Sequence, residues 1–299
     1  MPTSPSLSIK TVSLVLGSGG ARGLAHIGII RWLEEQNYQI KSISGSSIGA
    51  LIGGIYAAGK LDEFEAWLKG LSNTDILALM DIAWDRSGLI KGEKLNHILK
   101  KLIGNPNIED LSIPYTAVAT DIHHEKEVWL QTGSLLDAMR ASYSLPMIFT
   151  PHNYKGLTLI DGGVLNPVPI APTFGDNNDL TIAVNLGAKP QIKPHMPAPI
   201  NKIEDDSWLA DFNELVDKIK DYFVKEENRF EQPFNWDIYD ISNKAFDSMQ
   251  SSIARQQLAA YPPDITIDIP RNACGMLEFT LVNEMITLGY QTAEQTLNN

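Results

Sequence analysis

The sequence has few of the residues on which several common kinds of protein depend. It contains one cysteine, Cys274, so it can form neither an internal disulfide nor a cysteine metal cluster. Basic residues are the minority, because 24 Lys and Arg stand against 36 Asp and Glu and the formal net charge is −12 at pH 7. Nucleic acid is therefore excluded as an expected partner, since phosphate binding requires a basic face. The same charge disfavours unassisted attraction to anionic membrane surfaces.

Long hydrophobic runs are also missing. No stretch approaches the roughly 20 apolar residues that a membrane-spanning helix requires. The first residues lack the basic and apolar regions of a secretory signal. Together with the lone cysteine, these absences predict a cytoplasmic protein. Transient contact with the inner face of the membrane stays open as an alternative.

The 299 residues are nevertheless 43% hydrophobic and 20% charged, which is ample for a folded core. Residues 1–10 are polar and are predicted to be a flexible N-terminus, and residues 11–299 are predicted to form one domain. The first elements alternate as a strand over 11–16, a helix over 24–36, a strand over 38–44 and a helix over 50–58. This alternation predicts an α/β fold with a mostly parallel central sheet covered by helices.

Later elements follow the same hydrophobic patterns. Further strands are predicted over 114–120, 126–131, 157–160, 181–186 and 264–269, and further helices over 61–71, 73–83, 94–103, 134–142 and 276–297. Residues 190–260 form a more variable region, with a proline-rich stretch at its start and helical spacing over 208–223. This region is a candidate lid or acyl-chain site, and an ordinary packed helix is the alternative. Its last part, from 234 to 261, is predicted to be irregular at first and then helical.

The second predicted strand runs into Gly45-Ser46-Ser47-Ile48-Gly49, which fits the G-x-S-x-G pattern of a nucleophile elbow. In such an elbow, a tight turn between strand and helix holds the serine hydroxyl away from the backbone. Gly45 and Gly49 leave room for the strand and the helix to pass closely. The same pentapeptide also occurs as an ordinary turn, so Ser47 is a candidate nucleophile that needs support from elsewhere in the chain.

The first predicted strand is followed by the glycine loop Gly17-Ser18-Gly19-Gly20-Ala21-Arg22-Gly23. A dinucleotide fingerprint fails here, because Arg22 stands where the third glycine belongs and the second strand lacks the acidic residue that holds a ribose. A phosphate-binding loop fails because no Gly-Lys-Ser/Thr follows. The remaining interpretation is an oxyanion hole, in which backbone N–H groups stabilise the negative oxygen formed when Ser47 attacks a carbonyl group.

A base for Ser47 is harder to find, because the six histidines are poorly placed. The usual α/β-hydrolase order is Ser, then Asp or Glu, then His. Only His195 follows Asp161, and its proline-rich surroundings would hold an imidazole poorly. The adjacent pair His123-His124 has no further ligands at metal-binding spacing and is predicted to be a solvated turn. Two alternatives stay open: a Ser-Asp dyad, or a triad completed by a histidine that folding brings near.

The glycine loop, the Ser47 elbow and Asp161-Gly162-Gly163 resemble, in order and spacing, the patatin-like phospholipases, and especially the bacterial members related to the esterase domain of neuropathy target esterase. Residues 119–121, 141–146 and 165–169 also resemble family segments. The resemblance implies a three-layer α/β/α sandwich and a Ser-Asp dyad that hydrolyses lipid acyl esters, with no metal and no organic cofactor. Ser18 departs from the family pattern by interrupting the run of glycines.

The resemblance also implies a role for each matching residue. Ser47 is the nucleophile and Asp161 is the base or the group that orients it. Gly19 and Gly20 are the oxyanion-hole donors, and Arg22 belongs to the same loop and structures it. The supporting motif residues are Gly17, Gly45, Gly49, Gly162 and Gly163.

The predicted function is therefore that of a serine hydrolase whose partner is a lipid ester, either a phospholipid or a lysophospholipid. Two alternatives are a Ser-His-Asp carboxylesterase and a weakly catalytic regulatory protein of the same fold. The sequence does not determine the oligomeric state.

Overall fold

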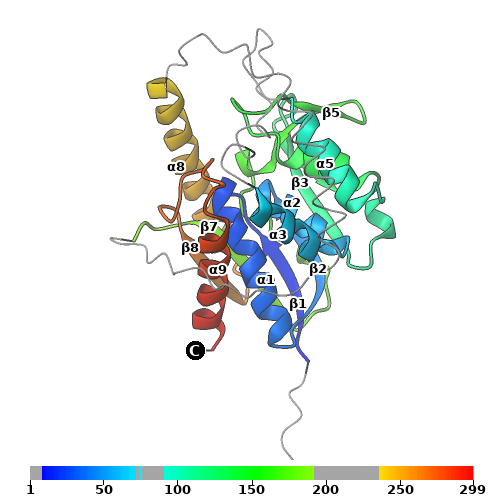
Figure 1. Cartoon of the computed structure of the whole chain (residues 1–299), viewed down its shortest axis with the longest axis vertical. Coiled ribbons are helices and arrows are strands. Elements are labelled where there is room, and N and C mark those ends of the chain that lie inside the picture. The colour runs from blue at the N-terminus through cyan, green and yellow to red at the C-terminus, as the bar shows by residue number, and fades with distance from the viewer. Residues whose placement is uncertain (1–8, 72–74, 76–90, 192–235, 299) are drawn as a thin grey trace, which may run out of the picture.

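The computed structural model describes residues 9–71, 75, 91–191 and 236–298 (Figure 1). Most of the N-terminus predicted to be flexible, most of the helix predicted over 73–83 and the helix predicted over 208–223 lie outside the described residues. The described strands are β1 (Thr11–Leu16), β2 (Gln39–Ser46), β3 (Tyr115–Asp121), β4 (Lys126–Leu130), β5 (His152–Tyr154), β6 (Leu157–Asp161), β7 (Leu180–Ala188) and β8 (Ile265–Pro270). The described α-helices are α1 (Ala25–Glu35), α2 (Ile48–Ala57), α3 (Leu61–Gly70), α5 (Glu93–Ile103), α6 (Leu135–Ser142), α8 (Trp236–Ala260) and α9 (Val282–Leu297).

The described strands form one sheet in the order β5-β6-β3-β2-β1-β7-β8, with β4 also paired to β3. Strands β3, β2, β1, β7 and β8 run parallel to one another. Strands β4 and β6 run antiparallel to β3, and β5 runs antiparallel to β6. Every residue of β3 is buried, as expected for a strand covered on both faces. The prediction of an α/β fold with a mostly parallel sheet is confirmed.

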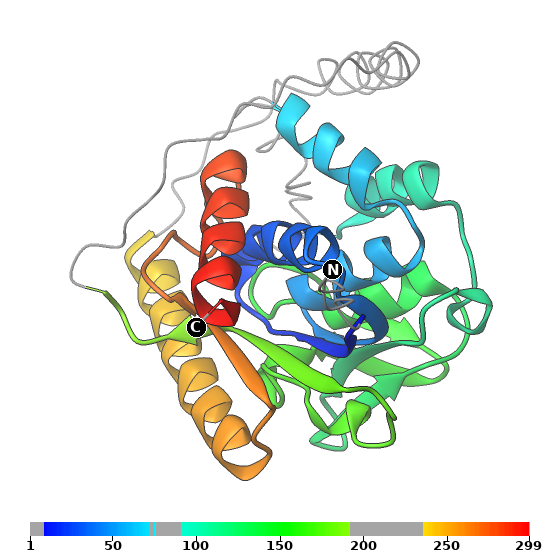
Figure 2. The same cartoon turned by 90° about the horizontal axis from the view of Figure 1, so that it is seen from below.

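Helices cover both faces of the sheet (Figure 2), with α1 and α9 on one face and α8 on the other. The larger hydrophobic core includes buried residues of α1, α2 and α9. On the opposite face, Ala254 of α8 packs with Val15 and Ala183 of the sheet. Helices α1 and α9 cross closely at Gly28, where a methyl group would come within 1.9 Å of the Ile286 carbonyl oxygen.

The structure corrects three predicted element boundaries. The glycine loop leads into a short 3-10 helix, Gly20–Leu24, so α1 starts only at Ala25. The last helix starts at Val282 instead of Met276, because the Met276 carbonyl oxygen accepts a hydrogen bond from the Ala21 N–H (2.8 Å) in the glycine loop. Helix α8 is regular from Trp236, where irregular structure is predicted from the sequence.

Two local details go beyond the elements predicted from the sequence. Strand β5 is absent from the sequence-based prediction; it pairs with β6 across a turn at Lys155 and Gly156, both of which have positive φ. Ser134 caps α6, since its Oγ accepts a hydrogen bond from the Asp137 N–H (3.2 Å). The Asp137 carboxylate contacts His152 Nε2 (3.2 Å). In the described ranges, none of the helices combines the length and the apolar character needed to cross a bilayer.

Candidate active site

Ser47 occupies a strained turn between β2 and α2. Its backbone has φ 57° and ψ −124°, a conformation that non-glycine residues rarely adopt and that surrounding contacts must hold. The Ser47 N–H donates to Ser142 Oγ (2.9 Å), and the Ser142 hydroxyl donates to the Val118 carbonyl oxygen (2.6 Å). Ser142 is thus a supporting residue to which the sequence assigns no role. The side chain of Ser47 lies at the N-terminus of α2, where the helix dipole favours negative charge.

Close backbone approach explains the glycines around this turn. A methyl group on Gly49 would lie 2.1 Å from the Leu16 carbonyl oxygen, so β1 and α2 can meet only at a residue without a side chain. A methyl group would come within 2.6 Å of a backbone atom at Gly17, Gly45 and Gly162 as well, and within 2.3 Å of the Gln250 side chain at Gly163. These glycines therefore keep the loops that carry the candidate site packed together.

The strand register brings Asp161 to Ser47. In the parallel pair β2 and β3, Ser46 lies opposite Val118, so Ser47 is level with the next residue, Ala119. In the antiparallel pair β3 and β6, Asp161 lies opposite that same Ala119. The Ser47 hydroxyl donates a hydrogen bond to Asp161 Oδ2 at 2.5 Å. Two residues separated by 114 positions in the chain thus meet across β3.

Burial gives Asp161 an unusual acidity. Its side chain is fully buried, and this desolvation raises the pKa of the carboxyl group to about 7. Two hydrogen bonds oppose the rise by stabilising the carboxylate: one from the Ser47 hydroxyl and one from the Gly163 N–H to Oδ1 (2.7 Å). A pKa near neutrality is the value at which a carboxyl group can both take up and release a proton.

The described histidines all lie elsewhere. His26 is buried in α1, where Nε2 contacts the Gly17 carbonyl oxygen (2.9 Å) and burial lowers its pKa to about 4. His124 contacts Asp121 (2.6 Å), His152 contacts Asp137, and His97 and His123 are exposed. His195 lies outside the described residues. No group of three or more His, Cys, Asp or Glu residues suited to a metal ion occurs in the described part of the chain.

The glycine loop lies beside Ser47. Gly19 is extended, with φ 170°, and Gly20 has φ 58°, so the chain turns sharply between them. On either side, the Ser18 N–H donates to the Pro167 carbonyl oxygen (2.8 Å) and the Ala21 N–H donates to the Met276 carbonyl oxygen. Among the backbone hydrogen bonds of the described loops, turns and caps, none has the N–H of Gly19 or Gly20 as its donor. These two groups are therefore candidates to bind an oxygen atom of a ligand.

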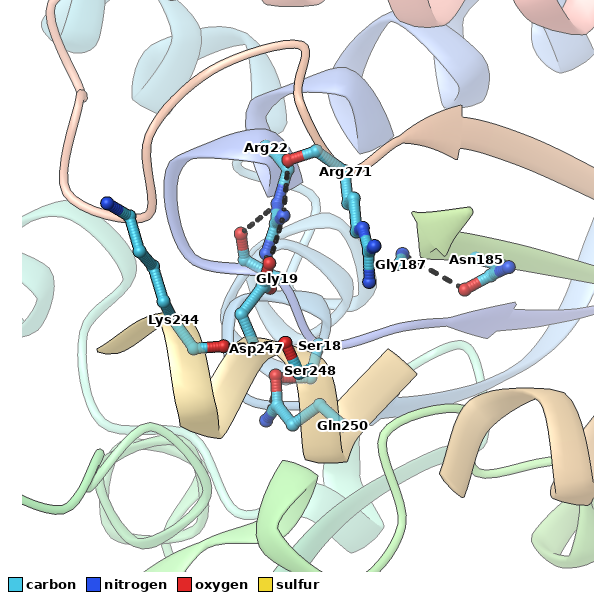
Figure 3. Close-up of polar contacts among 10 residues, drawn as sticks. All are labelled: Ser18, Gly19, Arg22, Asn185, Gly187, Lys244, Asp247, Ser248, Gln250 and Arg271. Atoms are coloured by element: carbon cyan, nitrogen blue, oxygen red, sulfur yellow. Dashed lines mark hydrogen bonds and ion pairs between the residues drawn. The ribbon is translucent and has the colours of Figure 1, made fainter. Parts of the chain in front are cut away.

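The Arg22 side chain binds the backbone of this loop (Figure 3). The side chain is buried, and its Nε donates to the Gly19 carbonyl oxygen at 3.0 Å. Its two terminal nitrogens reach the Arg271 carbonyl oxygen (2.7 Å) and the Asp247 carboxylate (2.5 Å). Arg22 thus links the loop backbone to Asp247 and Arg271, which lie more than 200 residues further along the chain.

An apolar cavity of about 150 Å³ opens next to Ser47 and Gly20. Its walls include Phe64 and Trp67 of α3, and Met276 in the loop before α9. The lining is almost entirely hydrocarbon, which suits an aliphatic chain and excludes a charged ligand. The candidate nucleophile therefore lies at the edge of a site for an apolar group.

Comparison with known proteins agrees with this geometry. The model of the patatin-like phospholipase family matches residues 14–174, which is more than half of the chain and includes the glycine loop, Ser47 and Asp161. The chain belongs to the patatin-like phospholipase family. Membership makes it a hydrolase of lipid esters.

Individual relatives of this patatin-like phospholipase are also informative. An uncharacterized NTE family protein of Mycobacterium tuberculosis is 37% identical over 344 aligned positions, covering 99% of this chain and 95% of the relative. A lysophospholipase, NTE1, of Cryptococcus neoformans is 32% identical over 193 positions, covering 62% of this chain but 12% of its own length. The crystal structure of VipD from Legionella pneumophila is a more distant match, with a TM-score of 0.47 and 15% identity over 98% of this chain and 67% of the VipD chain.

Proposed function

We propose that this patatin-like phospholipase uses a Ser47-Asp161 dyad to cleave carboxylic esters of lipids through an acyl-enzyme. The 2.5 Å hydrogen bond from Ser47 to a fully buried Asp161 carries the proposal. Asp161 takes the hydroxyl proton as Ser47 Oγ attacks the ester carbonyl, and the N–H groups of Gly19 and Gly20 bind the resulting oxyanion. Asp161 then gives the proton to the departing alcohol. A water molecule, deprotonated by Asp161, attacks the acyl-enzyme, and Asp161 returns that proton to Ser47 Oγ as the fatty acid is released.

With an aspartate as the base, the rate depends more strongly on the other groups of the site. A carboxylate is a weaker base than imidazole, so correct positioning and the oxyanion hole must supply much of the rate. The raised pKa of Asp161 reduces this disadvantage, because it brings the base closer to the pKa of an imidazole. Burial of Asp161 is therefore part of the proposed mechanism.

The substrate is inferred to be a phospholipid or a lysophospholipid. The apolar cavity beside Ser47 supports an acyl chain as the group that enters the site. Several relatives are named lysophospholipases, which favours a lipid with one acyl chain. Transient contact with a membrane surface stays a prediction.

Covalent labelling tests the proposed nucleophile. We expect a fluorophosphonate to inactivate the protein with one phosphonyl group bound per chain, located by peptide mass spectrometry on Ser47. The nucleophilic oxygen attacks phosphorus much as it attacks an ester carbonyl, and fluoride leaves. The matched control is Ser46→Ala, which alters the adjacent serine and should label at the normal rate. An adduct on any other serine would contradict the assignment.

The pH dependence of hydrolysis follows from the acidity of Asp161. The base must be ionised, and its pKa is raised to about 7 by burial. We therefore expect kcat/KM for a short p-nitrophenyl ester to rise with pH and to level off above neutrality, with one apparent pKa near that value. An exposed carboxylate would instead give a profile that is already level above about pH 5. A measurement between pH 5 and pH 9 separates the two.

A further inference from the structure

Helix α8 reaches the candidate oxyanion loop with two polar side chains. Asp247 and Gln250 are one helical turn apart and therefore share a face of α8. Figure 3 shows both on the turn of α8 beside Ser18, Gly19 and Arg22. Neither belongs to a motif of the sequence, and both lie beyond the residues that the family model matches.

The first contact is an ion pair. The Asp247 carboxylate accepts hydrogen bonds from both terminal nitrogens of Arg22, at 2.5 and 3.3 Å. The Arg22 side chain is 3% exposed and that of Asp247 is 24% exposed, so the pair is shielded from water on the arginine side. A shielded guanidinium that loses its carboxylate must find another acceptor or move.

The ion pair between Arg22 and Asp247 bears on the orientation of the peptide unit between Gly19 and Gly20. Arg22 Nε donates to the carbonyl oxygen of Gly19 at 3.0 Å. In a trans peptide unit, the C=O of one residue and the N–H of the next point in opposite directions. Fixing the Gly19 carbonyl therefore fixes the direction of the Gly20 N–H. Because Gly20 lines the cavity with Ser47, that direction decides whether the N–H can meet an oxyanion.

Gln250 acts at the neighbouring position. Its Nε2 donates to Ser18 Oγ at 3.1 Å. A methyl group on Gly163 would lie 2.3 Å from Gln250 Nε2 and 2.4 Å from Ser18 Oγ. Gln250 thus fills the point where the glycine loop meets the turn whose N–H holds Asp161. It sets the distance between the two loops.

We infer that Asp247 and Gln250 are positioning residues for ester hydrolysis. Asp247 orients the Gly20 N–H through Arg22 and the Gly19 carbonyl, and Gln250 sets the glycine loop against the Asp161 turn. This inference rests on the proposed Ser-Asp mechanism and deepens it. It makes α8, which lies outside the catalytic motifs, part of the machinery for stabilising the transition state.

The decisive variant is Asp247→Asn in the full chain. A misdirected N–H affects the transition state more than the bound ester, so we expect kcat for a short p-nitrophenyl ester to fall about 10- to 100-fold with KM little changed. The apparent pKa of the pH profile should stay as in the wild type, because Asp161 keeps its surroundings. Asp247→Glu should restore part of kcat, since it keeps the charge.

Matched controls separate positioning from general effects. Gln256→Ala changes an exposed residue on the opposite face of the same helix, and Glu294→Gln removes one exposed negative charge on α9. Both should have wild-type kcat. Arg22→Lys should lower kcat as well, and its combination with Asp247→Asn should cost much less than the product of the two single effects.

Each outcome decides the inference. A wild-type kcat in Asp247→Asn, a loss expressed mainly in KM, or a shifted apparent pKa would overturn it. Should Asp247→Asn fail to fold, Gln250→Ala carries the test, with an expected loss in kcat of about 3- to 10-fold at unchanged KM. Failure of the proposed function gives a different result. If Ser47→Ala is active, the Ser-Asp dyad is wrong. If Ser47→Ala is inactive but Asp247→Asn has wild-type kcat, only the positioning role of Asp247 is refuted.

Discussion

Replacing Asp161 with asparagine is expected to lower kcat/KM for a short p-nitrophenyl ester at pH 8 by about 10³-fold or more. An amide oxygen can still accept the hydrogen bond from Ser47, so the geometry of the pair is retained. It cannot take up the proton, so Ser47 would have to attack as a neutral hydroxyl. The measurement is steady-state hydrolysis, with Asp137→Asn as the control because that carboxylate contacts His152 on the exposed side of α6.

The stability of Asp161→Asn shows whether its lost activity reflects chemistry or misfolding. The folded-state pKa of Asp161 is about 7, well above the value of about 3.9 for an unfolded chain. The folded state therefore binds more protons between these values, and the contribution of Asp161 to stability falls as the pH rises from about 4 to 7. The asparagine amide of the variant does not titrate, so its contribution to stability does not change with pH. The melting temperature of Asp161→Asn relative to wild type should thus increase from pH 5 to pH 8.

Substantial activity in Asp161→Asn would contradict the dyad and revive the Ser-His-Asp alternative. The described histidines are engaged elsewhere, as with His26 on Gly17 and His152 on Asp137. His195 lies outside the described residues. A scan that replaces each histidine with alanine then identifies the base, and under the dyad none of the six changes the apparent pKa of the pH profile.

The half of the site near the N-terminus was predictable from sequence because its geometry is local. A strand, a glycine loop, a helix and a second strand ending at Ser47 form one right-handed unit, so both loops must emerge at the same edge of the sheet. The glycine loop could be proposed as an oxyanion hole for the same reason, whereas the roles of Gly20 and Arg22 came from the resemblance to the family.

The position of Asp161 was not predictable in this way. The sequence indicates a strand that ends at Asp161, but it does not indicate which strand is the neighbour or that the pairing is antiparallel. Only that register places Asp161 level with Ser47 across β3. If β6 ran parallel to β3, the Asp161 carboxylate would lie at a different distance from the Ser47 hydroxyl.

Two contacts between residues far apart in the chain were not predicted. Asp247 is 225 residues from Arg22, and Ser142 is 95 residues from Ser47. Asp247 lies in no motif, and Ser142 lies in a segment that resembles the family but whose sequence does not indicate a contact with Ser47. Met276 was predicted to begin the last helix because the residues after it are apolar at helical spacing, whereas Met276 and Leu277 precede α9 and line the cavity beside Ser47. Apolar periodicity cannot separate a helix face from a cavity wall.

Replacing Ser47 with alanine is expected to have the largest effect of all, lowering kcat/KM by about 10⁵-fold or more, to the level of background hydrolysis. Alanine keeps the backbone and the Cβ but removes the oxygen that forms the acyl-enzyme. Fluorophosphonate labelling should be lost in parallel. Ser46→Ala, at the adjacent buried position, is the matched control and should retain activity. Residual turnover above background would show that another residue supplies the nucleophile.

Replacing Ser47 with glycine separates the catalytic demand from the demand of the fold. The residue has φ 57° and ψ −124°, where a side chain costs on the order of 1–3 kcal/mol and glycine costs little. Glycine also gives the unfolded chain more freedom, which offsets about 0.5–1 kcal/mol of that relief. We therefore expect Ser47→Gly to be inactive yet more stable than Ser47→Ala by about 1 kcal/mol in chemical denaturation. If the alanine variant were the more stable, the turn would not be strained, and the hydroxyl would be presented to the ester by an ordinary loop. The expected order means that the fold tolerates a strained residue at this position because the reaction needs its oxygen there.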